Sequence, residues 1–140
     1  MNALVFSIIG SITGIAGMII GVAGIINNRF LAVHNYFLAM EDPEFVSARS
    51  AVYNCKNNMD LNNKDIAIVI NFFHHWGLLA KKHYLPLWIF DSGSGAGVIR
   101  LYELCCSYIK ARRKEHNDNT YASNFEWLYI TLLKRRKKWL

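Results

Sequence analysis

Residues 3–26 read ALVFSIIGSITGIAGMIIGVAGII, and this stretch contains no charged residue, no histidine and no proline. As an α-helix it would be about 36 Å long, enough to cross a hydrocarbon core of about 30 Å. All 16 Lys and Arg and all 10 Asp and Glu of the 140-residue chain lie behind it, and they give a net charge of +6. The sequence therefore predicts a membrane anchor over residues 1–28, followed by a basic domain.

A secretory signal peptide is the alternative interpretation of this stretch, with small residues such as Ala23 near a cleavage site. However, the apolar run exceeds a signal-peptide core of about 7–15 residues, and no Lys or Arg precedes it. We therefore favour an uncleaved, single-pass anchor. Because Arg29 and every other basic residue follow the anchor, the positive-inside rule predicts an external N-terminus and a cytoplasmic C-terminal domain.

Small residues recur along the anchor at alternating spacings of three and four. They are Ser7, Gly10, Gly14, Gly17, Gly21 and Gly24. Side chains that repeat every 3.5 residues stay on one line of a left-handed supercoil, and small ones let two backbones approach closely. Glycine also occurs in transmembrane helices that have no such partner. Because a single-span chain has no other helix of its own in the membrane, the pattern favours a homo-oligomer, of which a tetramer is one possible form.

The rest of the chain predicts an all-α fold, since no run alternates like a half-buried strand. Apolar residues at helical spacing continue the anchor as a stalk over residues 29–41. A single helical domain of about four helices is expected over 42–140, and its first helix should begin at Asp42 and Pro43.

The later elements of this domain are marked by caps, prolines and glycines. We expect a helix from about residue 64 to 82, a short turn within 85–90, and a glycine-rich loop over 91–97. Two more helices are expected over 98–114 and from Ser123, where Ser123 and Glu126 match a capping box.

Four segments of this domain carry a resemblance. They are PEFVSAR (43–49), INFFHHWGLLAKKHYLP (70–86), VIRLYELCCSYIKARR (98–113) and NFEWL (124–128). Their succession resembles a bacterial helical domain of unknown function that is often found behind an N-terminal membrane helix. In size and layout the chain is also similar to membrane effectors of type III CRISPR loci, which respond to cyclic oligoadenylates. The resemblance implies a place in the bacterial inner membrane and a role in antiviral defence.

Catalysis and metal binding find little support in the sequence. No HExxH, GxSxG or Walker pattern is present, so we predict that the protein is not an enzyme and has no cofactor. His74 and His75 are adjacent and would point about 100° apart on a helix, which makes a shared metal ion difficult. The three cysteines lack CxxC spacing and are expected to be reduced core residues.

The glycine-rich loop is the best candidate for a ligand site. The backbone N–H groups of the loop with Gly93, Ser94, Gly95 and Gly97, the dipole of the next helix, and Arg100 one turn in would together suit a phosphate. The same glycines would also serve as a plain connection between two helices.

The preceding helix supplies further candidates for this site, namely His74, His75, Trp76 and Lys81. A Trp face beside cationic groups suits a nucleobase and its phosphate.

Two basic runs, 110–114 and 134–138, close two of the predicted helices. They fit a solvated helix end, a contact with anionic inner-membrane lipid, or a polyanionic ligand. Nothing in them reads a base sequence, so no sequence-specific nucleic-acid binding is expected.

Together these features predict a membrane-anchored, homo-oligomeric defence effector whose cytoplasmic domain binds a phosphate-bearing signal, such as a cyclic oligoadenylate, and acts on the membrane. Two alternatives stay open. One is a membrane-tethered scaffold for a partner protein, and the other is a small pore-former that needs no signal.

Overall fold

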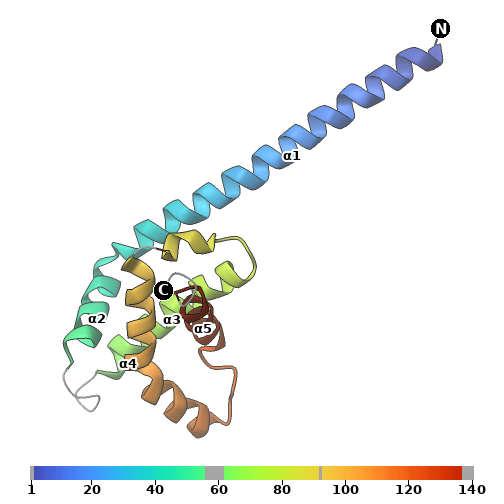
Figure 1. The fold of residues 1–140 in the computed structure, drawn as a ribbon. Helices are drawn as coiled ribbons and strands as arrows, with labels where there is room; N and C mark the ends of the chain where they lie inside the picture. Colours follow the sequence, from blue (N-terminus) through green and yellow to red (C-terminus); the bar gives the residue numbers. More distant parts are fainter. Residues whose placement is uncertain (1, 56–61, 92, 137–140) are drawn as a thin grey trace.

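The computed structural model describes residues 2–55, 62–91 and 93–136, and for residues 2–12, 15 and 16 the helical backbone alone. Every regular element in these ranges is helical, so the expected all-α fold is confirmed. A long apolar N-terminal helix is followed by a helical bundle (Figure 1). The elements are α1 (Asn2–Met40), α2 (Pro43–Asn54), α3 (Asn63–Lys81), the 3₁₀-helix η1 (Leu87–Phe90), α4 (Gly93–His116) and α5 (Ser123–Arg136).

Helix α1 passes from the predicted anchor into the predicted stalk without interruption. It ends at Met40 because Pro43 disfavours a helical residue before it and fixes the start of α2. The predicted cap is also present, since the backbone N–H of Phe45 donates to Oδ1 of Asp42 at 3.1 Å.

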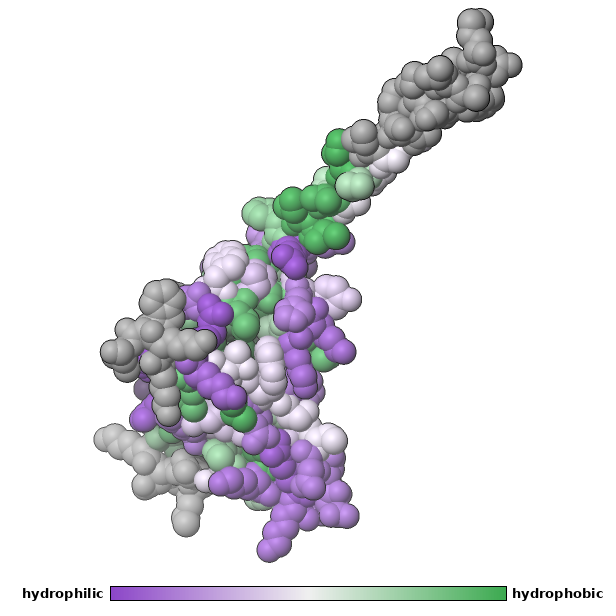
Figure 2. Space-filling view, turned by 45° about the vertical axis from the view of Figure 1, so that its right-hand side comes forward, coloured by the Kyte–Doolittle hydropathy of each residue, from purple (hydrophilic) through white to green (hydrophobic). Residues whose placement is uncertain are grey.

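Within the described residues, Gly17–Met40 of α1 is long and apolar enough to cross a membrane, judged by length and composition. It overlaps the charge-free stretch in residues 17–26. A signal sequence near the N-terminus would meet the same criteria. Figure 2 shows hydrophobic surface on α1 just where the helix leaves the bundle.

Helix α3 forms the centre of the bundle and packs against α2 and α5. Phe73 of α3 stacks on Phe125 of α5 with ring centroids 5.1 Å apart. The last turns of α1 belong to the same core, because Tyr36 is only 1% exposed and its ring lies 5.2 Å from that of Trp76. The apolar N-terminal helix is therefore docked onto the bundle by a buried aromatic contact.

The expected glycine-rich loop is instead the first turn of α4, which begins at Gly93 rather than Val98. Packing on η1 explains the difference. The Ser94 hydroxyl donates to the Ile89 carbonyl at 2.8 Å, and a Cβ on Gly95 would overlap the Phe90 carbonyl oxygen. Only glycine allows the helix to start this close to η1.

Helix α5 begins at Ser123 as expected, but Glu126 does not complete a capping box among the described contacts. Its carboxylate instead accepts a hydrogen bond from Nη2 of Arg113 at 2.8 Å. Arg113 also donates through Nε to the Tyr121 carbonyl at 2.9 Å, which joins the end of α4 to the segment before α5.

Candidate functional site

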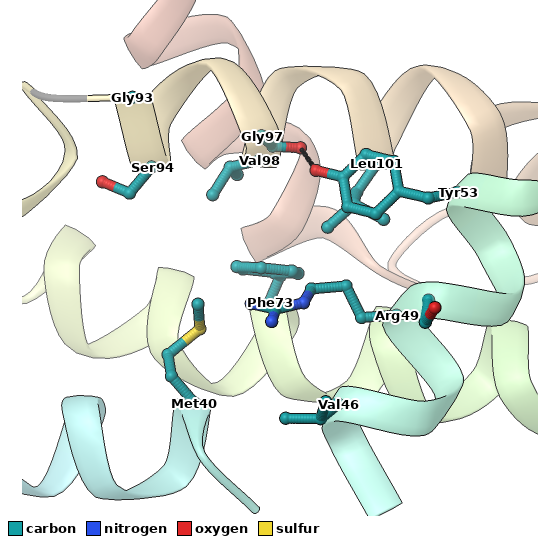
Figure 3. A pocket seen from close by; sticks show the side chains of 11 residues that line it. Met40, Val46, Arg49, Tyr53, Phe73, Gly93, Ser94, Gly97, Val98 and Leu101 are labelled. Atoms are coloured by element: carbon teal, nitrogen blue, oxygen red, sulfur yellow. Dashed lines mark hydrogen bonds between the residues drawn. The ribbon is translucent and has the colours of Figure 1, made fainter.

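A cavity of about 490 Å³ lies between α2 and the first turns of α4 (Figure 3). Four elements build it, because α1 contributes Met40 and α3 contributes Phe73. The remaining lining residues are Val46, Arg49, Ser50 and Tyr53 of α2 and Gly93, Ser94, Gly97, Val98 and Leu101 of α4. The floor is apolar, whereas the polar groups come from two facing helices.

Arg49 supplies a charged group to this cavity. Its side chain extends from α2 towards the space beside Phe73 (Figure 3), and its guanidinium carbon lies 5.5 Å from the centre of the Phe45 ring. Among the ion pairs of the described residues none involves Arg49, and no Asp or Glu lines the cavity. A half-buried guanidinium without a carboxylate favours an anionic ligand.

Tyr53 closes the wall between the two helices. Its hydroxyl donates to the Gly97 carbonyl at 2.9 Å. Burial raises the pKa of Tyr53 above its ordinary value, while the charges of Arg49 and Arg100 act in the opposite direction. Tyr53 therefore remains a neutral hydrogen-bond donor at physiological pH.

The start of α4 adds partial positive charge to the same cavity. Gly93 begins a 24-residue helix, and the first turn of such a helix carries the positive end of the helix dipole. Gly97 lies one turn further on, and a Cβ there would come 2.9 Å from the Tyr53 hydroxyl oxygen. The helix start and Arg49 thus approach the cavity from opposite sides.

Part of the site expected from the sequence is brought together here. Gly93, Ser94 and Gly97 line the cavity. Arg100 is exposed and does not line it, although it is close enough to influence the pKa of Tyr53. Gly95 faces away, towards a second cavity of about 260 Å³ between η1, α4 and α5.

The candidates on α3 are not brought into this cavity. Trp76 is buried against Tyr36, and Nε2 of His74 lies 3.2 Å from the side-chain amide nitrogen of Asn124 on α5. His75 and Lys81 are exposed. The nucleobase platform expected around Trp76 is therefore absent from the described lining.

Sequence reasoning missed Arg49 and Tyr53. Arg49 ends the PEFVSAR segment and stands four residues after the buried Phe45, at the edge of the apolar face of α2. This position at the edge of an apolar helix face is the sequence feature that could have identified Arg49. A charged residue bordering a buried stripe often points along the interface between two helices.

The four glycines of α1 whose surroundings the structure describes face open space. A Cβ on Gly14, Gly17, Gly21 or Gly24 would have no neighbour within 4 Å. For Ser7 and Gly10, the remaining members of the pattern, the side-chain surroundings lie outside the described residues.

Two other expectations concern the cysteines and the basic tail. Cys105 is buried, and burial raises the pKa of its thiol to about 12, so it is not a reactive thiolate. No cluster of three or more metal-ligating side chains occurs among the described residues. The second basic run is described only as far as Arg136.

Comparison with known families covers most of the chain. A family described as "Domain of unknown function (DUF4760)" matches residues 11–132. No curated protein and no solved structure matches the chain. The expected likeness to a helical domain of unknown function is therefore confirmed.

Proposed function

The chain belongs to the DUF4760 family, and we propose that it is a membrane-anchored receptor for a small phosphate-bearing ligand held between α2 and α4. Binding is passed to α1, and through α1 to the membrane. The observation that carries this proposal is Arg49, whose guanidinium lines a cavity without an acidic partner among the described residues.

The cavity supports a ligand with an anionic head and a partly apolar body. Arg49 and the N–H groups of the first turn of α4 suit phosphate oxygens, whereas Val46, Phe73 and Leu101 offer apolar contacts. About 490 Å³ suits one nucleotide-sized group. A cyclic oligoadenylate would place one such group in each of several copies of the domain.

The position of Met40 supports transmission to the membrane. This last residue of α1 lines the cavity, so a bound ligand would touch the stalk directly. The packing of α1 would then depend on whether the cavity is filled.

The surroundings of the glycines support an oligomeric effector. Gly95 and Gly77 are each required by a close contact within the chain, whereas Gly14, Gly17 and Gly21 meet nothing. Association of α1 helices along this line would explain their spacing. A ring of such copies would give antiviral effector activity its route to the bilayer.

Titration calorimetry of the detergent-solubilised full chain tests the proposal. The probes are inorganic phosphate, AMP and cyclic oligoadenylates of several ring sizes. We expect saturable binding of at least one phosphate ester. Arg49→Gln should weaken it about tenfold or more, and Arg49→Lys less, because lysine keeps the charge but not the planar fork.

Lys114→Gln is the matched control, since it removes one positive charge from an exposed position at the far end of α4. It should leave binding unchanged. Absence of saturable binding across the panel, or equal affinity of Arg49→Gln and wild type, would contradict the proposal and leave the scaffold and the signal-independent pore-former.

A further inference from the structure

A group of exposed aromatic side chains surrounds the point where α1 leaves the bundle. Phe30 and Phe37 of α1 are 71% and 50% exposed, and Tyr84 and Trp88 are 63% and 61% exposed. We call these four residues the aromatic collar. Figure 1 shows η1 directly beside the lower end of α1, and the turn that carries Tyr84 leads into η1. The Tyr36 ring links the two parts, because it lies 5.6 Å from both the Phe37 and the Phe90 rings.

Lysine and arginine side chains also lie at the end of the bundle where α1 leaves it. Lys81 and Lys82 are exposed at the end of α3, and His83 separates them from Tyr84. Arg135 of α5 pairs with Asp91 at 2.7 Å, which brings the end of α5 next to η1 and places the exposed Lys134 nearby.

At the opposite end of the bundle the two arginines of α4 are matched by acids, whereas Lys110 and Lys114 are exposed there without an ion pair among the described residues. Arg112 pairs with Glu115 at 3.0 Å, and Arg113 pairs with Glu126 at 2.8 Å. Near the α1–α2 junction two of the three acidic groups are engaged, since Asp42 caps α2 and Glu44 lies 3.2 Å from Lys64, while Glu41 is exposed. Lys81, Lys82 and Lys134 are in none of the ion pairs of the described residues, so they leave positive charge exposed at the α1 end of the bundle.

We propose that the α1 end of the bundle lies directly on an anionic bilayer surface, with Tyr84 and Trp88 in the interfacial layer and Lys81 and Lys82 on lipid phosphates. The proposal rests on the membrane anchoring in the proposed function and adds a specific lipid-facing surface. Trp and Tyr are enriched at membrane interfaces, and basic side chains close to the membrane surface are attracted to anionic lipid.

Continuity with α1 supports a bilayer rather than water next to this surface. Exposed apolar side chains run along α1 from Ile25 past Phe30 to Leu38, and Arg29 is the only charged residue within Gly17–Met40. The polar residues in this part of α1 are Asn27, Asn28, Arg29, His34 and Asn35, and the helix continues without a break from the candidate span into the bundle. A second copy of the chain fits this surface less well, because its own Lys81 and Lys82 would face like charges.

Fluorescence quenching by brominated lipid tests the contact in full-length protein reconstituted into phosphatidylglycerol vesicles. We expect Trp88→Phe to remove about half of the lipid-dependent quenching of tryptophan emission. Trp127→Phe is the control, because Trp127 lies half-buried on α5, away from η1, and its loss should leave the quenching in place. Lys81→Gln with Lys82→Gln should lower Trp88 quenching towards the value in phosphatidylcholine vesicles.

A tryptophan at Ile20, introduced into the Trp88→Phe protein, reports on the anchor separately, since Ile20 is 71% exposed on α1. Quenching at position 20 without quenching of Trp88 would overturn this inference alone. Absence of quenching at position 20 would overturn the anchor itself. Trp88 accessible to aqueous acrylamide, or protected from both quenchers by another copy, would also contradict the bilayer contact.

Discussion

Gly95 shows how one backbone position determines where a helix begins. A Cβ at this position would overlap the Phe90 carbonyl, whereas a Cβ at Gly93 would meet nothing within 4 Å. The two glycines lie two residues apart in the same turn, so they form an internal comparison.

We expect Gly95→Ala to destabilise the protein by about 1–3 kcal/mol, because α4 would have to move away from η1. Gly93→Ala should stay within about 0.5 kcal/mol of wild type, since it fills open space. Thermal unfolding of both variants in one detergent measures the difference. Equal stability of the two would show that η1 does not restrict the start of α4.

His74 gives the bundle a dependence on pH. Burial lowers the pKa of His74 below its ordinary value, and the neighbouring charge of His75 lowers it further. The unfolded chain therefore binds a proton at this residue at a higher pH than the folded chain does. The contribution of His74 to the free energy of unfolding is fully present above the ordinary histidine pKa of about 6.5. It is lost as the pH falls from there towards the lower pKa of the folded protein.

The unfolding temperature of wild type should thus drop more between pH 7.5 and pH 5.5 than that of His74→Gln. His116→Gln is the control, because His116 is exposed at the far end of α4. An equal drop in wild type and His74→Gln would assign the pH dependence to other groups.

The connection between α4 and α5 depends on one arginine. Arg113 is largely buried, with 19% of its side chain exposed, and it holds both the Tyr121 carbonyl and the Glu126 carboxylate. Its neighbour Arg112 pairs with Glu115 at the surface.

Arg113→Gln should cost about 1.5–3 kcal/mol, because it leaves two partly buried acceptors without their charged donor. Arg112→Gln should change the unfolding temperature little, since exposed ion pairs are screened by water and salt. Urea unfolding of the two variants compares them directly. A similar loss in both would mean that the α4–α5 connection is stabilised by net charge instead.

The helices themselves were largely predictable, because caps and periodicity act locally. Asp42 and Pro43 marked the start of α2, and Ser123 marked the start of α5. The start of α4 could not be predicted from the sequence, because glycine has a poor helix propensity. Gly95 is required at this position only because the helix contacts the Phe90 carbonyl. The cavity was half predictable for a similar reason. Its glycines stood out in the sequence, whereas Arg49 joins them only through the packing of α2 on α4.

At the scale of the whole molecule, the exposed line of glycines on α1 is the feature without an explanation inside the chain. Replacing Gly17 and Gly21 by leucine should shift the protein towards monomer, because the larger side chains keep helices apart. The bundle should unfold at an unchanged temperature, since neither glycine has a neighbour within 4 Å.

Chemical cross-linking in vesicles measures the shift in oligomeric state. Val22→Leu is the control, since Val22 is exposed on the same helix but outside the glycine line. Unchanged cross-linking of the glycine variant would contradict association through this face.

The buried Tyr36 fixes the C-terminal end of α1 in the domain core, so a change in the core would reorient the whole helix. The helix has 39 residues and is therefore about 58 Å long. A rotation of about 5° at Met40 would displace the far tip by about 5 Å, roughly one helical turn. A change in the domain too small to disturb its own packing would thus be amplified at the opposite end of the chain.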